Sequence, residues 1–228
     1  MHAAAPCPVE IKKQMIDWWG PIVDEYYASS EAHGSTLITA EEWLTHPGSV
    51  GRPLAGAVHI VGEDGAELLP GEPGEIYFEG GFDFEYLNDP DKTASSRHAS
   101  GWKTVGDIGY VDEEGYLYLT DRRHHMIISG GVNIYPQEAE NLLVTHPKVM
   151  DAAVFGVPDD EMGQRVKAVV QTVDPDDATP EFADELVAWL RDRLAHYKCP
   201  RSISFEAQLP RTDTGKLYKQ ELIARYSR

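Results

Sequence analysis

The first apolar pattern along the chain has helical spacing. Between Pro8 and Trp19, apolar side chains recur at intervals close to three and four residues, and Gly20-Pro21 interrupts them. Positions at this spacing share one face of an α-helix, and Gly and Pro are common where helices end. The sequence therefore predicts an amphipathic helix over residues 8–19. Its apolar positions are Ile11, Met15, Trp18 and Trp19.

Short runs of β-forming residues come next, separated by turn residues. They lie at residues 58–61, 75–79 and 108–111, and such runs are typical of strands. The acidic segment Asp112–Gly115 predicts a hairpin loop before the next run, because glycine adopts positive φ at little cost. An abrupt polar run then begins at Thr120. We place a domain boundary there and expect a β-rich unit within residues 1–120.

Helix and strand patterns alternate beyond this boundary. A helical pattern starts at Pro136 and stops before Pro147, and residues 149–157 and 165–173 have strand character. Thr179-Pro180 is typical of a helix N-terminus and precedes a further amphipathic pattern. We therefore expect residues 121–228 to form one compact α+β domain.

The net charge of the chain excludes one class of function. The 228 residues include 20 Lys and Arg against 38 Asp and Glu, a formal net charge of −18, which excludes a generally basic nucleic-acid-binding protein. No apolar run approaches the ~18 residues that a spanning helix needs, and the first residues lack the features of a signal peptide. We expect a cytoplasmic chain without an integral membrane segment. Cys7 and Cys199 are expected to be buried thiols rather than a disulfide.

Two glycine-containing segments could contact a ligand. In the segment Thr212–Lys216, a flexible Gly beside a Lys could present an ammonium group to a phosphate or carboxylate, although an exposed turn lysine is the simpler interpretation. In the segment Ser129–Pro136, the pair Gly130-Gly131 separates an apolar strand from a helix start, where a thin ligand could lie against the backbone. An ordinary tight strand-to-helix turn explains the same pair equally well.

Three further segments carry titratable groups. Asp107, after Gly106, could accept hydrogen bonds from two ribose hydroxyls or could be a solvated turn residue. Residues 26–31 combine aromatic rings, hydroxyls and Glu31, which could stack on a base and hold Mg²⁺, with a polar strand end as the alternative. His124-His125 lies in a segment expected to be extended, so its side chains would point to opposite faces and a zinc site is not expected.

Taken together, four motifs resemble those of the acyl-adenylate-forming superfamily of acyl-CoA synthetases, adenylation domains and beetle luciferases. Residues 118–136 (YLTDRRHHMIISGGVNIYP) resemble its domain-junction motif, and residues 27–31 its aromatic–small–Ser/Thr–Thr/Ser–Glu motif. Gly101-Trp102 with Gly106-Asp107 resembles its ribose-binding motif, and residues 209–216 its C-terminal lysine motif. The motifs stand in family order, and the resemblance covers nearly the whole chain.

The resemblance implies a fold. Family members are more than twice as long as this chain, and their phosphate-binding loop lies upstream of anything present in it. The chain therefore resembles a C-terminal piece of α+β class. Residues 1–120 would be the end of the large AMP-binding domain, including its β-barrel subdomain, and residues 121–228 the small mobile C-terminal domain.

The resemblance also implies an activity with ATP, Mg²⁺ and coenzyme A. The parent enzyme would activate a carboxylic acid, expected to be a fatty acid, as acyl-AMP and transfer the acyl group to coenzyme A, with the small domain rotating between the two steps. Lys216 would serve adenylation, Asp107 and Arg122 would hold the ribose, and Tyr27 would stack on the adenine. Ser30 and Glu31 would face phosphate and Mg²⁺, Gly130 and Gly131 would line the pantetheine path, Asn133 would contact the nucleotide, and His124 would be the hinge.

The chain departs from the family pattern at three positions. His124 stands where Asp or Lys is common, so we expect a hinge that titrates near neutral pH. An unchanged ratio of adenylation to thioester rates between about pH 5.5 and 8, which brackets the ordinary histidine pKa, would refute this. Val105 replaces the usual Thr, so we expect no hydroxyl contact from that position. Ile128 replaces a Lys of relatives that act on aromatic acids, which favours a less polar acyl group.

Three functional alternatives stay open on the sequence. The leading one is a fatty-acid–CoA ligase fragment, inactive alone because it lacks the phosphate loop, and the second is an aryl-CoA ligase fragment. The third is a non-catalytic nucleotide-binding or interaction module. A truncated large domain would expose apolar surface, so we expect self-association through Trp18, Trp19 and the Tyr26-Tyr27 pair.

Overall fold

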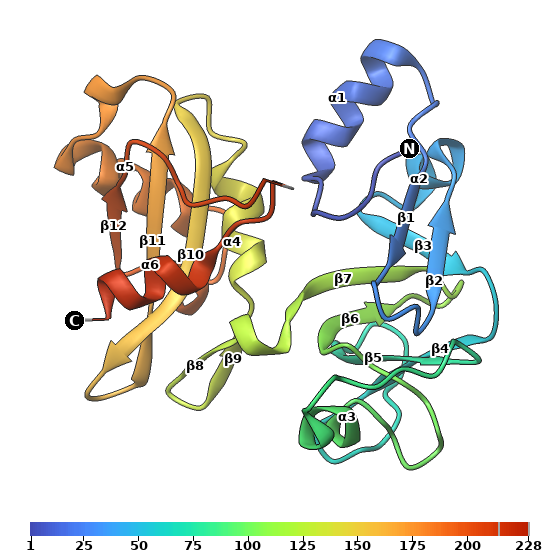
Figure 1. The fold of residues 1–228 in the computed structure, drawn as a ribbon. Coiled ribbons are helices and arrows are strands. Elements are labelled where there is room, and N and C mark those ends of the chain that lie inside the picture. Colours follow the sequence, from blue (N-terminus) through green and yellow to red (C-terminus); the bar gives the residue numbers. More distant parts are fainter. Residues whose placement is uncertain (214, 228) are drawn as a thin grey trace. The chain divides into compact units, whose positions relative to one another are not determined.

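The computed structural model describes residues 1–213 and 215–227, and the chain divides into two compact units, Met1–His124 (unit 1) and His125–Arg228 (unit 2) (Figure 1). The sequence prediction places a boundary after residue 120. The assignment of residues 1–120 and 121–228 as functional domains stays a prediction.

Unit 1 is built around an antiparallel sheet. Within the described residues its strand order is β1-β2-β3-β7-β6-β5-β4, and every neighbouring pair is antiparallel. The predicted helix and β-type runs are confirmed as α1, β4, β5 and β6. The elements are α1 (Val9–Trp19), β1 (Glu25–Ala28), β2 (Ser35–Ile38), α2 (Ala40–Thr45), β3 (Ser49–Pro53), β4 (Ala57–Val61), β5 (Gly74–Glu79), α3 (Pro90–Ser95), β6 (Asp107–Val111) and β7 (Leu117–Arg122).

The β-barrel expected from the resemblance takes the form of an open sheet. Among the described strands β1 and β4 are the two edges, and no pairing joins them. Apolar side chains of β4, β5 and β7 form a core against the sheet, including Ile60, Ile76, Phe78 and Leu117. The predicted β-rich unit is therefore present without closure.

Helix α1 is correctly predicted, but its buried face is different from the expected one. The buried residues are Lys12 and Ile16, whereas Trp18 and Trp19 are 78% and 49% exposed. Lys12 is buried because its Nζ lies 2.6 Å from Glu25 Oε2 and 4.9 Å from the centroid of the Trp43 ring. Apolar spacing alone cannot indicate a charged residue at a core position.

Unit 2 has helices on both faces of a mixed sheet. In the described part the order is β10-β11-β8-β9, and β12 pairs in parallel with β11. The predicted helices and long strands are confirmed as α4, α5, β10 and β11. The elements are β8 (Ile127–Ser129), β9 (Val132–Ile134), α4 (Pro136–Leu143), β10 (Val149–Asp159), β11 (Gly163–Thr172), α5 (Pro180–Arg191), β12 (Ser202–Phe205) and α6 (Lys219–Tyr226).

Strand alternation explains why both faces of this sheet are covered. Ala152 and Val154 of β10 belong to the core that includes Leu143 of α4 and Leu186 of α5. Ala153 and Phe155 belong to a second core that includes Leu222 of α6. Successive strand residues point to opposite faces, so α4 and α5 cover one face and α6 the other (Figure 1).

Two expectations from composition can be compared with the structure. Cys7 and Cys199 are free thiols, Cys199 buried and Cys7 partly buried. No helix formed by residues 1–213 or 215–227 has the length and hydropathy needed to cross a bilayer.

Candidate functional site

Strand register brings Asp107 and Arg122 together in unit 1. The two residues are Cα partners at the end of the β6–β7 pair, and Arg122 Nε lies 3.3 Å from Asp107 Oδ1. The sequence pattern assigned Thr120 to Arg122 to a domain boundary, but these polar residues complete β7. A β-bulge beside Thr120, between the pairs Ile108↔Asp121 and Gly109↔Leu119, changes the face on which Arg122 emerges.

Tyr27 joins this pair from strand β1. Its hydroxyl donates to Asp107 Oδ2 at 2.5 Å, across 80 residues of sequence. Burial, together with the charge of Asp107, raises the pKa of the Tyr27 hydroxyl well above its ordinary value. The phenol is therefore protonated at neutral pH and keeps donating to Asp107. Three predicted site residues thus form one cluster, joined by a hydrogen bond and an ion pair, which we call the Asp107 cluster: Tyr27, Asp107 and Arg122.

Glu31 lies in the loop after β1 and is held by a residue that the sequence motifs did not indicate. Tyr86 donates its hydroxyl to Glu31 Oε1 at 3.0 Å. Burial acts to raise the pKa of Glu31, but hydrogen bonds from its own backbone, Tyr86 and Ser29 outweigh it and lower the pKa. The carboxylate is therefore ionised at neutral pH, while the neighbouring Ser30 is exposed. The pairing with Tyr86 spans 55 residues, and no local sequence signal indicates it.

The described residues contain no group of three or more His, Cys, Asp or Glu side chains suited to hold a metal ion. A Mg²⁺ ion at Glu31 would therefore need further oxygens from water and from a bound phosphate. Mg²⁺ commonly binds in this way, through a carboxylate or two plus substrate phosphates. Glu31 fits such a role because it is ionised and only partly buried.

Gly130 and Gly131 form a hairpin turn between β8 and β9, so the alternative of a strand-to-helix turn is wrong. Ser129 of β8 pairs with Val132 of β9, and both glycines have positive φ, 58° and 79°. Two-residue hairpins of this type need positive φ at both central positions. A Cβ on Gly130 would lie 2.4 Å from Met162 Cε, whereas one on Gly131 would meet nothing within 4 Å. The backbone at Gly131 is thus open to a ligand.

The remaining residues of the junction motif flank this hairpin. Asn133 and Ile128 are exposed and are Cα partners across the β8–β9 pair. His124 lies in the 3-10 turn Arg123–His125 rather than in an extended segment. The division between unit 1 and unit 2 falls directly after it.

Lys216 is exposed on a tight turn of unit 2. The Thr212 N–H donates to the Lys216 carbonyl at 2.9 Å, and the Gly215 N–H donates to the Thr212 carbonyl at 2.8 Å. Arg211 pairs with Leu217 across the turn. Thr214, part of the predicted lysine motif, lies outside the described residues.

The lysine turn and the glycine turn lie at opposite ends of β10. Arg211, beside the lysine turn, binds Asp151 near the start of β10. Gly130 donates its N–H to the carbonyl of Met162, which comes after the end of β10 at Asp159. From Asp151 to Asp159 the strand spans roughly 26 Å at its usual rise. The structure thus brings the Asp107 cluster together in unit 1 and keeps these two turns of unit 2 apart.

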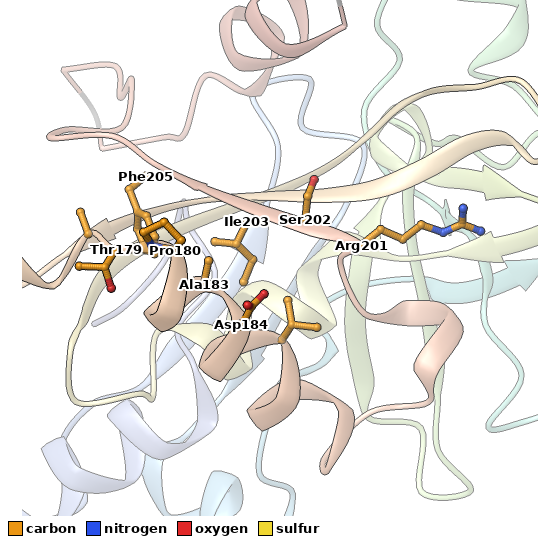
Figure 2. Close-up of a pocket in the computed structure, with 10 residues that line it drawn as sticks. Thr179, Pro180, Ala183, Asp184, Arg201, Ser202, Ile203 and Phe205 are labelled. Carbon is orange, nitrogen blue, oxygen red and sulfur yellow. The ribbon is translucent and has the colours of Figure 1, made fainter.

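A separate pocket of about 510 Å³ lies between α5 and β12, and Figure 2 shows its lining. Thr179 is the N-cap of α5, Pro180 and Asp184 come from its start, and Ile203 and Phe205 come from β12. None of the predicted site residues lines this pocket. It is therefore not the site that the motifs predict.

Comparison with known proteins identifies the family. The family model for AMP-binding enzymes matches residues 1–84, and that for the AMP-binding enzyme C-terminal domain matches residues 138–216. A feruloyl-CoA synthase of Amycolatopsis sp. is 39% identical over 224 residues, which cover 97% of this chain and 45% of the relative. A long-chain-fatty-acid–CoA ligase of Bacillus subtilis is 38% identical over 226 residues, 98% of this chain and 40% of the relative.

Solved structures agree with this relationship. ATP-bound MatB from Rhodopseudomonas palustris superposes with a TM-score of 0.83 at 30% identity, covering 99% of this chain and 44% of that one. The o-succinylbenzoate CoA synthetase of Bacillus subtilis, in complex with its acyl-adenylate intermediate, gives 0.81 at 32% identity over 96% of this chain and 44% of that one. The chain thus spans less than half the length of the proteins it matches. By its motifs, fold and relatives, it belongs to the AMP-binding, acyl-adenylate-forming enzyme family, and the two curated relatives named above are CoA ligases.

Proposed function

We propose that this chain provides part of an AMP-forming acid–CoA ligase. In the first step a carboxylate oxygen bonds to the α-phosphorus of ATP, the bond to the β-phosphate bridge breaks, and pyrophosphate leaves. In the second step the sulfur of coenzyme A bonds to the acyl carbon, AMP leaves, and the thiol proton is released. ATP, Mg²⁺ and coenzyme A are thus the proposed partners, and their availability in the cytoplasm supports a cytoplasmic location.

The observation that carries this proposal is the separation of the two turns in unit 2. A lysine suited to charge neutralisation and a bare glycine backbone suited to a thin ligand lie at opposite ends of β10. A rigid unit cannot place both ends at one reacting carbonyl. A two-step ligase that rotates its small domain about a hinge such as His124 would use each end in turn.

The Asp107 cluster is the proposed nucleotide site. Each carboxylate oxygen of Asp107 has one protein partner, Tyr27 or Arg122. A carboxylate oxygen has two lone-pair positions, so Asp107 can still accept hydrogen bonds from ribose hydroxyls while its orientation stays fixed. The ring of Tyr27 would stack on the adenine.

The other predicted residues receive roles in the same scheme. Lys216 would neutralise charge on the carboxylate and the α-phosphate as they approach, and Ser30 and Glu31 would face phosphate and Mg²⁺. Gly130 and Gly131 would line the path of the pantetheine arm, and Asn133 would contact the nucleotide. The exposure of Lys216, Gly131 and Asn133 to solvent supports these assignments.

A fatty acid is the proposed acyl substrate, and an aromatic acid is the second candidate. Ile128 is 51% exposed beside the glycine turn and gives that surface an apolar character, which supports an aliphatic acid. The 39% identity to a feruloyl-CoA synthase supports an aromatic one, against 38% for a long-chain-fatty-acid ligase.

Pyrophosphate release with ATP, Mg²⁺, coenzyme A and a panel of aliphatic and aromatic acids tests the proposal. We expect none from the 228-residue chain alone. The product of the whole reading frame should release pyrophosphate with at least one acid, and Lys216→Ala should slow this release at least about a hundredfold. Acid-dependent release by the chain alone would overturn its proposed inactivity. An unimpaired Lys216→Ala protein would overturn the role of Lys216.

Self-association of the chain is a separate proposal. Trp18 and Trp19 are exposed and stacked, with ring centroids 5.1 Å apart, and large exposed apolar groups often mark interaction surfaces. Sedimentation at micromolar concentration should show species larger than a monomer, which Trp18→Ser should reduce. A clean monomer would contradict this.

A further inference from the structure

The turn that carries Lys216 is fastened by the guanidinium group of Arg211. Arg211 donates from Nε to Asp151 Oδ2 and from Nη2 to Asp151 Oδ1, both at 2.7 Å. It also donates from Nη1 to the carbonyl of Gly215 at 2.5 Å. That carbonyl belongs to the peptide group directly before Lys216. A single side chain therefore connects strand β10 to the backbone that carries the lysine.

These contacts depend on the shape of arginine. A guanidinium group is planar and offers several N–H donors in fixed directions, so it can hold both oxygens of a carboxylate and still donate elsewhere. A lysine ammonium is a point charge on a flexible stem and cannot reproduce this fork. The Asp151 side chain is only 15% exposed, which keeps the acceptor end of the contact rigid.

The chain is also anchored on the other side of Lys216. Lys219, the first residue of α6, places Nζ 2.8 Å from Glu140 Oε1, and the two side chains are 5% and 7% exposed. Glu140 also accepts a hydrogen bond from the Val154 N–H of β10 at 2.6 Å. The exposed lysine thus sits between two anchored points, both tied to β10.

We propose that Arg211 and Asp151 are positioning residues for Lys216, fixing the direction in which its ammonium group leaves the turn. The inference rests on the proposed adenylation role of Lys216. Neither residue needs to touch a substrate. Both lie at the lysine end of β10, so the glycine turn at the other end should work without them.

The first test compares the two half-reactions in the product of the whole reading frame. ATP–pyrophosphate exchange measures adenylation, and thioester formation from supplied acyl-adenylate measures the second step. In Arg211→Lys and Asp151→Asn we expect the exchange kcat to fall at least about tenfold, because small misplacements of a catalytic group have effects of this size or larger. The KM for ATP and the rate of thioester formation should stay within about twofold of their values in the unaltered protein, a much smaller change than the fall in the exchange kcat.

Arg225→Lys is the matched control. Arg225 also binds carboxylates, but they belong to Glu206 and Glu221, and Arg225 itself lies in α6, beyond the lysine turn. The same substitution there should leave exchange unchanged. Thermal unfolding followed by circular dichroism shows that each variant is folded at the assay temperature.

A double-mutant cycle separates positioning from a general structural effect. If Arg211 acts through Lys216, Arg211→Lys added to Lys216→Ala should lower the residual exchange no further. A further drop equal to that of the single variant would overturn the inference, and so would an Arg211→Lys protein indistinguishable from Arg225→Lys. If Lys216→Ala itself leaves exchange unchanged, the proposed function of Lys216 is wrong and the inference is overturned with it.

Discussion

A buried lysine pairs with a glutamate in the described part of each unit. The candidate site residue beside the pair is partly buried in unit 1 and exposed in unit 2. In unit 1 the pair is Lys12–Glu25 at 2.6 Å, and in unit 2 it is Lys219–Glu140 at 2.8 Å. Each pair anchors the start of an element, β1 in unit 1 and α6 in unit 2. Glu25 lies two residues before the candidate site residue Tyr27, and Lys219 lies three residues after Lys216.

The site residue beside each pair is held differently in the two units. Tyr27 is partly buried and donates its hydroxyl to Asp107, whereas Lys216 is exposed. In unit 1 the groups proposed to bind the nucleotide are also part of the hydrogen-bonded structure. In unit 2 the proposed catalytic group is presented on a turn that other residues hold. Stability and function should therefore be coupled in unit 1 and separable in unit 2.

The largest expected effect comes from breaking the buried pair of unit 1. Lys12→Met leaves Glu25 buried without its closest cation, so the free energy of unfolding should fall by about 3–5 kcal/mol. Urea unfolding of the 228-residue chain measures this. Lys13→Met, on the exposed side of the same helix, is the control and should change it by less than about 0.5 kcal/mol. Equal effects of the two substitutions would show that the Lys12 contacts contribute nothing.

The next effect tests the coupling directly. Asp107→Asn weakens the contacts with Tyr27 and Arg122, so the free energy of unfolding should fall by about 1–3 kcal/mol. Lys216→Ala should leave it within about 0.5 kcal/mol. Both should impair pyrophosphate release by the whole protein. If Lys216→Ala destabilises the chain as much as Asp107→Asn does, the contrast between the units is wrong.

A smaller effect is expected at the glycine turn. Gly131 has φ 79°, so Gly131→Ala should cost about 1–2 kcal/mol of stability, the usual penalty of a left-handed L-residue. Gly131→Asn should cost less, since asparagine tolerates this region better. If the bare backbone binds pantetheine, both variants should slow thioester formation. A normal rate of thioester formation in both variants would show that Gly131 serves only to form the turn and does not contact pantetheine.

The smallest effect concerns pH in unit 1. Burial lowers the pKa of His33, and the positive charge of Lys103 lowers it further. The negative charges of Asp107 and Glu31 act to raise it but are outweighed. An unfolded chain then binds a proton more readily than the folded one, so stability is full above the ordinary pKa of about 6.5 and is lost as pH falls from there towards the folded pKa. His33→Gln should make the urea unfolding midpoint depend less on pH over this window. His196→Gln, at an exposed histidine, should leave that pH dependence unchanged. If the urea midpoint of His33→Gln depends on pH as strongly as that of the unaltered chain, a group other than His33 causes the pH dependence.

Helical spacing and runs of apolar residues predict the longer helices and several of the strands. Helix spacing found α1, α4 and α5, and apolar runs found β4–β6, β10 and β11. Short strands such as β2 and β9 are not predicted, because three or four residues hold too little periodicity. The order of the motifs predicts Tyr27, Asp107 and Arg122 as site residues, and the structure joins these three side chains.

The supporting contacts could not be predicted in the same way. Tyr86 reaches Glu31 across 55 residues, and Arg211 reaches Asp151 across 60. Such pairs arise from the folded arrangement of strands rather than from any spacing in the sequence. Lys12 shows the same limit, because a charged residue in a buried position becomes favourable only when Glu25 is brought beside it.

The sheet of unit 1 has a consequence for synthesis on the ribosome. Strand β3 pairs with β7, joining Ser49 to Tyr118, whereas β10 and β11 meet through a short connection from Asp159 to Gly163. Closing a long loop is slow compared with closing a hairpin. As the chain emerges, β1, β2 and β3 can pair early, but one edge of β3 must wait for β7. An unpaired edge invites pairing with another chain, so the interval between these two strands is when a nascent copy is most exposed to misassembly.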